Sequence, residues 1–298
     1  MVTNQVVFLT SLGGVGDHGY NDLILTGFER EYAKLPNNVI MMMLYTPKDM
    51  SQVEETVRTF CNYGAEIAEK TIIVLAGSDY RDFLIQFISN EGCIDPSVEF
   101  LLFESPQLSE LSDDIKAYSF TIDMYKSCYE AGVFAAQSGF QSPLVWLANP
   151  SDNVLIRAGL GFSDGYFSVS GQYPDKEYLS SDMSGYSMSA QAYEKMSGFD
   201  DKYDFIFPVM GGSSMGIFRY LREHPEGPAV VGMDVDQSIY STNVVGNILK
   251  SIDRIVEIYI DRWINGYKLD KFMEYGAESG FIEWSVTDTC QYGNSLLL

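Results

Sequence analysis

Apolar runs and amphipathic stretches alternate along the chain from its start. A short apolar run at 6–10 ends at a glycine-rich loop, and apolar residues then recur at helical spacing between residues 23 and 28. This pattern predicts a strand, a loop and a helix in that order. Because the loop leaves the carboxyl end of a strand, where open α/β sheets bind ligands, we expect its polar and aromatic residues to face a ligand.

The same alternation continues through the first 122 residues. Further strands are predicted at 39–45, 71–75, 100–103 and 117–122, and helices at 49–63 and 80–88. Continuous apolar strands between amphipathic helices are typical of a parallel sheet that is covered on both faces.

The pattern restarts after residue 123. Helices are predicted at 124–139, 154–167, 187–196 and 216–222, and strands at 144–147, 178–179, 205–209 and 229–233. The small residues of AGVFAAQSG, in the first of these helices, favour close helix packing. The two series predict an α/β protein of two lobes, each a doubly wound parallel sheet.

The end of the chain does not supply a third lobe. We interpret 244–263 as one long amphipathic helix and 280–284 as a short strand, which together cannot bury an apolar face. The helix is therefore expected in the first lobe and the strand in the second, with three hinge crossings near 121–125, 236–243 and 274–280. The expected N-terminal lobe is 1–122 with 242–276, and the expected C-terminal lobe is 123–241 with 277–298.

Charge limits the partners. Among 298 residues there are 41 acids against 19 lysines and arginines, a formal net charge of −22. A negative field of this size disfavours nucleic acid and anionic membrane surfaces. It suits a neutral, zwitterionic or cationic ligand. No apolar run approaches the ~20 residues that span a bilayer. No signal peptide is recognisable at the start, so a cytoplasmic protein and an exported chain without its leader both stay open.

Cysteine and histidine give no site of their own. Cys61, Cys93, Cys128 and Cys290 are widely spaced, and we expect each to be a small buried apolar residue. With only two histidines, His18 and His224, a histidine-rich metal site is excluded, and we expect no metal and no cofactor. The evidence for a phosphate-binding glycine loop is weak, because no Lys-Ser/Thr follows it and Asp17 near the helix start would repel an anion.

Five segments in order resemble one protein family. They are GVGDHGYND, SFTIDMYKSCYEAGVFAAQSG, AGLGFSDGY, FIFPVMGGSSMG, and VVGMDVDQS followed by NILKSIDRIVEIY. Together they resemble the basic membrane protein and purine nucleoside receptor family, which are substrate-binding lipoproteins of ABC importers. The resemblance implies the type I periplasmic binding protein fold.

The resemblance also implies a function. We expect an extracytoplasmic solute-binding protein that captures a nucleoside-like ligand between two lobes and delivers it to the permease of an ABC importer, without enzymatic activity. It would be a periplasmic or cell-surface lipoprotein, held at the membrane only by a lipid anchor outside this sequence.

The family's binding residues carry over to matching positions. Tyr20 is expected to stack on one face of a base, with Phe207 or Met210 as a weaker candidate for the other face. Asn21 can hydrogen-bond a hydroxyl or a ring nitrogen. Asp234 can accept from two vicinal hydroxyls, and Lys250 can donate to a ribose oxygen. The remaining expected contacts are Asp17, Gly77, Ser78, Asp123, Gly211 and Gly212.

Ordinary structural roles stay open for several of these side chains. Tyr20 could pack on its own helix, Asp234 could cap a turn, and Lys250 could be a solvated helix residue. Asp123 could equally be a hinge hydrogen-bonding group. At the level of the whole protein, the alternatives are a ligand-sensing regulatory domain of the same fold or a nucleoside-processing enzyme.

The sequence departs from the family where the base is read. Family members often carry an acid just after the first strand, whereas this chain has Ser11 and Leu12 there. His18 and Gly19 replace the usual Lys-Ser, and Asp22 replaces Gln. The ribose end is retained and the base-reading end is not, so we expect only modest discrimination among bases.

Overall fold

The computed structural model describes residues 2–36, 39–90, 92–93 and 95–287. They form two compact units. The first unit consists of Met1–Val15, Asn21–Ile122 and Ile252–Glu274, and the second of Gly16–Tyr20, Asp123–Ser251 and Tyr275–Leu298. The glycine loop at 16–20 thus belongs to the second unit, although the strand before it belongs to the first. Each unit is an α/β structure with its own sheet.

The sheet of the first unit is doubly wound. Its strand order is β11-β5-β4-β3-β1-β2, and β2, β1, β3, β4 and β5 pair in parallel. The strands are β1 (Val2–Thr10), β2 (Ile40–Tyr45), β3 (Ala68–Ala76), β4 (Val98–Phe103), β5 (Ala117–Ile122) and β11 (Phe272–Tyr275). Because β2 and β3 flank β1 on opposite sides, the order reverses at β1.

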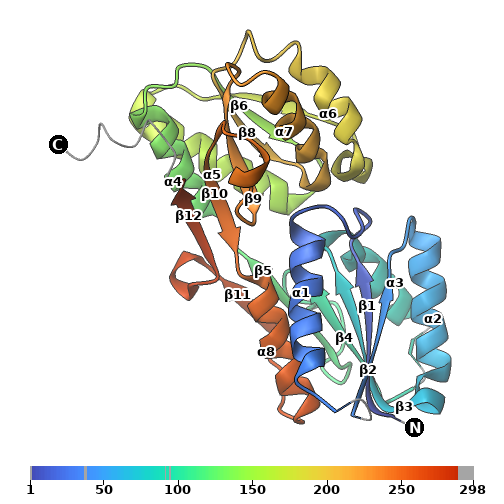
Figure 1. The fold of residues 1–298 in the computed structure, drawn as a ribbon. Helices are drawn as coiled ribbons and strands as arrows, with labels where there is room; N and C mark the ends of the chain where they lie inside the picture. The colour runs from blue at the N-terminus through green and yellow to red at the C-terminus, as the bar shows by residue number, and fades with distance from the viewer. Residues whose placement is uncertain (1, 37–38, 91, 94, 288–298) are drawn as a thin grey trace. The chain divides into compact units, whose positions relative to one another are not determined.

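Helices cover both faces of this sheet (Figure 1). They are α1 (Tyr20–Ala33), α2 (Met50–Ile67), α3 (Arg81–Asn90) and α8 (Ile252–Ile264), with a 3₁₀ turn, η1 (Ser78–Tyr80), before α3. Successive strand residues point to opposite faces. Val7 and Leu9 of β1 pack with α2 and α3, whereas Phe8 lies against Phe28 of α1 with ring centroids 4.5 Å apart.

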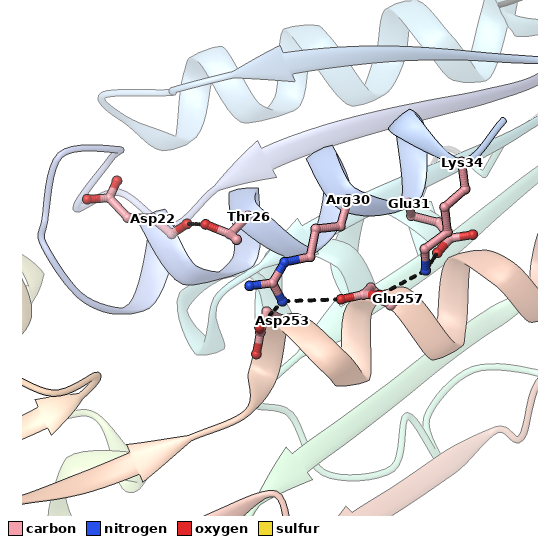
Figure 2. Close-up of polar contacts among 7 residues, drawn as sticks. All are labelled: Asp22, Thr26, Arg30, Glu31, Lys34, Asp253 and Glu257. Carbon is pink, nitrogen blue, oxygen red and sulfur yellow. Dashed lines mark hydrogen bonds and ion pairs between the residues drawn. The ribbon is translucent and has the colours of Figure 1, made fainter. Parts of the chain in front are cut away.

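Helices α1 and α8 pack closely and share an ion-pair network (Figure 2). A Cβ at Gly27 would lie 2.4 Å from the carbonyl oxygen of Asp253, so only glycine permits this approach. Arg30 Nη1 lies 2.6 Å from Asp253 Oδ2, and Lys34 Nζ lies 2.9 Å from Glu257 Oε2. The hydrogen bond from Lys34 lowers the pKa of Glu257, against a smaller opposing effect of burial.

The second unit repeats this plan. Its order is β12-β10-β9-β8-β6-β7, all parallel except β12, which runs antiparallel to β10. The strands are β6 (Pro143–Leu147), β7 (Asp175–Tyr178), β8 (Phe205–Val209), β9 (Ala229–Asp234), β10 (Val244–Lys250) and β12 (Ile282–Val286). The helices are α4 (Tyr125–Gln137), α5 (Asn153–Ser170), α6 (Ser189–Met196) and α7 (Ser214–Glu223). The predicted fold class, two doubly wound α/β lobes, is confirmed.

Glycines bring α4 and α5 together. A Cβ at Gly132, Gly161 or Gly165 would lie 2.0–2.3 Å from a carbonyl oxygen of the facing helix. The close packing predicted for AGVFAAQSG is therefore confirmed, with further glycines supplied by α5.

The long helix expected at 244–263 is wrong. Residues 244–250 form β10 in the second unit, and only Ile252–Ile264 is helical, in the first. The chain therefore passes between the units after Ser251 and not within 236–243. The expected boundary at residue 242 moves with it. The apolar positions of the strand continue into those of the helix with one residue between, so their combined spacing imitates a single helix.

Two cysteines are not simple buried apolar residues. Cys61 of α2 and Cys93 form a disulfide with their Cα atoms 4.9 Å apart. Their separation of 32 residues gave no sequence signal, because the folding of α2 and α3 onto one face of the sheet brings them together. Cys128 is a buried free thiol, as expected. Cys290 lies outside the described residues.

Candidate functional site

Each unit has a point where its strand order reverses. Ligands of open α/β sheets bind beyond the carboxyl ends of the strands at such a point. In the first unit these ends are Thr10 of β1 and Ala76 of β3, which lie opposite each other in the parallel pairing of the two strands. In the second unit they are the ends of β6 and β8, at Leu147 and Val209. Most of the expected site residues follow strand ends of this kind.

Asn21 closes the loop after β1 in the first unit. Its side chain is 2% exposed, its Oδ1 accepts from the Ser11 backbone at 3.0 Å, and its Nδ2 donates to Ser11 Oγ at 2.9 Å. The amide therefore fixes the end of β1 in place. Gly77 and Ser78 follow the neighbouring strand β3, as expected, and Ser78 is half-buried at the start of η1.

Asp79 is a functional candidate that sequence reasoning missed. Its Oδ2 accepts from the Leu12 backbone at 3.3 Å, and a Cβ at Gly77 would lie 2.2 Å from its Oδ1. Burial, and to a smaller extent the charge of Asp79, raises the pKa of Tyr80. A carboxylate therefore lies beside Leu12 after all. It comes from the loop after β3 and not from the loop after β1.

A buried ion pair lies at the carboxyl ends of β9 and β10 in the second unit. The two strands are parallel, and Asp234 pairs in register with Leu249, next to Lys250. Lys250 Nζ lies 3.5 Å from Asp234 Oδ1, and the two side chains are only 4% and 8% exposed. Asp234 also has a left-handed backbone with φ of +70°. Lys250 is therefore neither on a helix nor solvated, contrary to that alternative.

The loop at 16–20 contributes its aromatic side chain to the same place. Lys250 Nζ lies 5.4 Å from the centroid of the Tyr20 ring, within the range of a cation–π interaction. A Cβ at Gly19 would lie 3.4 Å from Asp234 Oδ2, in ordinary contact at most. Tyr20, Asp234 and Lys250 are thus brought together as the resemblance implies.

Asp17 lies next to the turn that follows β8. It is 7% exposed, its Oδ1 accepts from Gly19 N at 3.1 Å, and a Cβ at Gly212 would lie 3.5 Å from the Cα and Cβ of Asp17. Gly211 has a φ of +53°, a conformation that L side chains rarely adopt. The glycine loop and the Gly-Gly turn therefore lie next to each other within the second unit.

Tyr186 is a second candidate that the sequence did not reveal. A Cβ at Gly211 would lie 3.1 Å from Tyr186 Cδ1, and the Tyr186 hydroxyl donates to Asp152 Oδ2 at 2.7 Å. Asp152 caps α5 at the end of β6, accepting from Val154 N at 2.9 Å. The half-buried Tyr186 ring comes from the 3₁₀ turn η2 (Met183–Ser187), and no recognised motif pointed to that turn.

Phe207 and Met210 do not offer a surface for a ligand. Both are 0% exposed, and Phe207 stacks on Phe162 of α5 with centroids 4.4 Å apart. Successive residues of β8 point to opposite faces of the sheet, and the side chain of Phe207 points to the face that α5 covers. The half-buried Tyr186 is the aromatic group beside the same turn.

Asp123 is a structural group of the chain crossing. It forms a two-point ion pair with Arg157, at 2.9 and 3.0 Å, and its backbone N–H donates to the Tyr275 carbonyl at 2.9 Å. Burial raises the pKa of Asp123, but hydrogen bonds from Arg157 and from the Tyr125 backbone outweigh it, so the pKa is lowered. Of the two roles left open, the structure shows the hydrogen-bonding one.

An ion pair and an aromatic ring make up the centre of this constellation. Burial raises the pKa of the Cys128 thiol, so the free cysteine near Lys250 is an uncharged, unreactive group. Within the described ranges, no cluster of three or more His, Cys, Asp or Glu side chains could hold a metal ion. None of the helices described there is both long and apolar enough to cross a membrane.

The two doubly wound lobes have the fold of type I periplasmic binding proteins. Residues 4–292 match the family model described as "ABC transporter substrate-binding protein PnrA-like". The chain belongs to this family.

Known proteins similar to the chain agree with that assignment. Basic membrane protein C of Borreliella burgdorferi strain N40 is 27% identical over 171 residues, which cover 53% of this chain and 45% of that protein. The match thus spans less than half of the relative's length. A solute-binding protein of an ABC transporter system from Aeropyrum pernix K1 superposes with a TM-score of 0.76 at 19% identity, covering 96% of this chain and 76% of that one.

A regulatory protein shares the fold as well. A transcriptional activator of the comK gene from Bacillus halodurans superposes with a TM-score of 0.67 at 12% identity, covering 94% of this chain and 89% of that one. At such identities the structural similarity shows the fold alone. The assignment to a substrate-binding family rests on the family model.

Proposed function

We propose that this protein is an extracytoplasmic solute-binding protein that captures a nucleoside-like ligand and delivers it to the permease of an ABC importer. The observation that carries the proposal is the buried pair of Asp234 and Lys250 beside Tyr20. A buried ion pair contributes little net stability, because desolvation offsets its attraction. Its place at two adjacent strand ends, together with the strained backbone of Asp234, supports a binding role.

The pair suits a sugar with neighbouring hydroxyls. A carboxylate can accept from two vicinal hydroxyls, and an ammonium group can donate to a ring or hydroxyl oxygen. Tyr20 adds an aromatic face of the kind that a base or a sugar ring stacks on. These are three of the four interactions that a nucleoside requires, and all three come from the second unit.

The fourth interaction, with the edge of the base, is the proposed role of Asp79 in the first unit. A carboxylate accepts from a ring N–H or an exocyclic amino group more strongly than a neutral acceptor does. Because Asp79 supplies a charged acceptor, we expect discrimination among bases to be at least as strong as the modest level expected from Ser11 and Leu12.

The disulfide supports an extracytoplasmic location. Disulfides persist in oxidising compartments and are rare in the cytosol. Of the two compartments left open by the sequence, the exported one therefore fits better. Attachment by a lipid anchor stays part of the proposal. So does the absence of enzymatic activity, because Ser163 and Ser214, the central serines of the two GxSxG stretches, are buried and the free thiol is buried as well.

The regulatory alternative has one observation in its favour, the similarity in fold to the comK activator. The net charge of −22 speaks against a direct role on DNA. Co-purification with an ABC permease after mild crosslinking would distinguish the transport role from a sensing role.

Thermal shifts and calorimetry test the ligand class. Adenosine, guanosine, inosine, uridine and cytidine are compared with their free bases and with ribose. We expect nucleosides to stabilise the protein more than either part. Free bases that stabilise as well as nucleosides, or nucleosides that do nothing, would contradict the proposal.

A substitution tests the Asp234–Lys250 pair. Asp234→Asn keeps a side chain that tolerates φ of +70° but removes the charge, and we expect it to weaken nucleoside binding by about 2–4 kcal/mol. Glu226→Gln, at a side chain that is 79% exposed, is the control for loss of one negative charge. Circular dichroism of both variants verifies folding, and equal affinities would return Asp234 to a structural role.

A further inference from the structure

The loop at Gly16–Tyr20 is held by the connection between β9 and β10 through the side chains of Gln237 and Tyr240. Gln237 Nε2 donates to the backbone carbonyl of His18 at 3.1 Å. The Tyr240 hydroxyl lies 3.2 Å from His18 Nδ1, and the two rings meet edge to face with centroids 5.5 Å apart. All of these residues belong to the second unit. Both groups thus contact His18, one through the backbone and one through the side chain.

Gln237 is itself rigidly placed. It is 3% exposed, its Oε1 accepts from Met233 N at 2.8 Å, and its backbone N–H donates to Asn247 Oδ1 at 3.0 Å. Asn247 Nδ2 donates in turn to Asp236 Oδ1 at 3.1 Å. Gly232 leaves the room for this arrangement, because a Cβ there would lie 1.9 Å from Asn247 Oδ1. The amide that reaches the loop therefore projects from a fixed, buried support.

His18 has a backbone conformation that requires such support. Its φ is +53°, a left-handed conformation that residues other than glycine rarely adopt. A residue of this kind persists where its surroundings hold it. Its immediate neighbours in the loop are Asp17 and Gly19, and Tyr20 follows. The conformation of His18 therefore sets where the Asp17 carboxylate and the Tyr20 ring lie.

We propose that Gln237, Tyr240 and His18 are positioning residues that hold the loop in its binding conformation before a ligand arrives. They need not touch the ligand. A loop that is already ordered loses less conformational entropy on binding, so the same contacts give a higher affinity. The proposal rests on the proposed function for its effect on affinity, but its effect on the loop can be measured without any ligand.

Hydrogen exchange of the ligand-free protein is the first test. Tyr240→Phe removes only the hydroxyl, and Gln237→Met removes the amide with little change in volume. Each hydrogen bond lost should speed exchange of the loop amides by roughly three- to tenfold, with little change in the strands of either sheet. His18→Asn, which tolerates a positive φ and keeps a side-chain acceptor, should restore slow exchange relative to His18→Ala. His224→Ala, at the only other histidine, is the control and should leave the loop unchanged.

Calorimetry with the nucleoside that gives the largest thermal shift is the second test. Tyr240→Phe should weaken binding by roughly three- to tenfold at unchanged melting temperature. Gln237→Met should weaken binding to a similar extent but also lower the melting temperature, because Met233 N loses its acceptor. His18→Asn should bind more nearly like wild type than His18→Ala. Loop exchange that equals wild type in both variants would overturn the proposal. So would faster exchange with unchanged affinity. If wild-type protein binds no nucleoside, the proposed function fails, and hydrogen exchange alone decides whether these residues hold the loop.

Discussion

Under the proposed function, the carboxylate of Asp79 is the side chain with the greatest expected consequence for base discrimination. It lies at the reversal point of the first sheet, beside Leu12. A hydrogen bond to a charged group contributes about 1.5–3 kcal/mol, against about 0.5–1.5 kcal/mol for a neutral one. One base edge that donates to Asp79 would therefore be preferred roughly tenfold or more over an edge that cannot.

Replacing Asp79 by Asn tests that role. The amide oxygen can still accept from Leu12 N, so the loop should keep its structure while the charge is lost. We expect the ratio of affinities between the best and the worst nucleoside to fall by about tenfold, measured by calorimetry across the panel. Asp82→Asn, at an exposed acid in the first turn of α3, should leave the ratio unchanged. A ratio that is equally large in Asp79→Asn would remove Asp79 from base recognition.

At this scale the sequence revealed residues that lie within a recognisable motif. Asp234 is the last residue of β9, and Asn21 in the first turn of α1 bonds Ser11 just after β1. Asp79 and Tyr186 escaped because their importance depends on partners far along the chain. Asp79 is 67 residues from Leu12, and Tyr186 is 34 residues from Asp152. Phe207 was misjudged because a motif does not tell which face of β8 a side chain occupies.

At the scale of elements, most strands and helices were predictable because each carries one hydrophobic period. The exception is the segment that contains Lys250. Strand β10 and helix α8 are separated by Ser251 alone, so apolar residues of a buried strand and of an amphipathic helix form one run. A fully buried strand has no alternation to mark it. The correction moves Lys250 from the flank of a helix to a strand end next to Asp234.

The α4–α5 contact allows a test of packing. A Cβ at Gly165 would lie 2.0 Å from the Tyr129 carbonyl oxygen, which is backbone and cannot move aside as a side chain can. We expect Gly165→Ala to lower the free energy of unfolding by about 1–3 kcal/mol, despite the better helix propensity of alanine. Thermal and urea unfolding followed by circular dichroism measure the change.

Gly159→Ala in the same helix is the matched control. A Cβ there would meet only side-chain carbons of Val145 and Leu147, at 3.2–3.5 Å. Its effect should be much smaller than that of Gly165→Ala. Equal effects of the two substitutions would mean that the glycines are tolerated in α5 and not required for the helix contact.

At the scale of the whole molecule, the two units share one strand order, with β1 and β6 at equivalent positions. Right-handed crossovers between parallel strands leave few alternatives to such an order, so the double α/β plan followed from the alternation of elements. The disulfide did not follow, because its two cysteines meet only when α2 and α3 lie on the same face of the sheet. The place of the loop at 16–20 in the second unit was equally hidden, since its neighbours in sequence belong to the first.

Closure on ligand binding is the change of the whole molecule that we predict from the proposed function. We propose that the protein closes about its hinge crossings when ligand binds. We therefore expect the radius of gyration in small-angle X-ray scattering to decrease when a verified ligand-free sample is saturated with the best nucleoside. Ligand is first removed by unfolding and refolding, because a bound molecule carried through purification would hide the change. Asp234→Asn at the same nucleoside concentration should keep the larger radius, since it binds too weakly to close. An unchanged radius for saturated wild-type protein would contradict capture by closure while leaving the binding site itself intact.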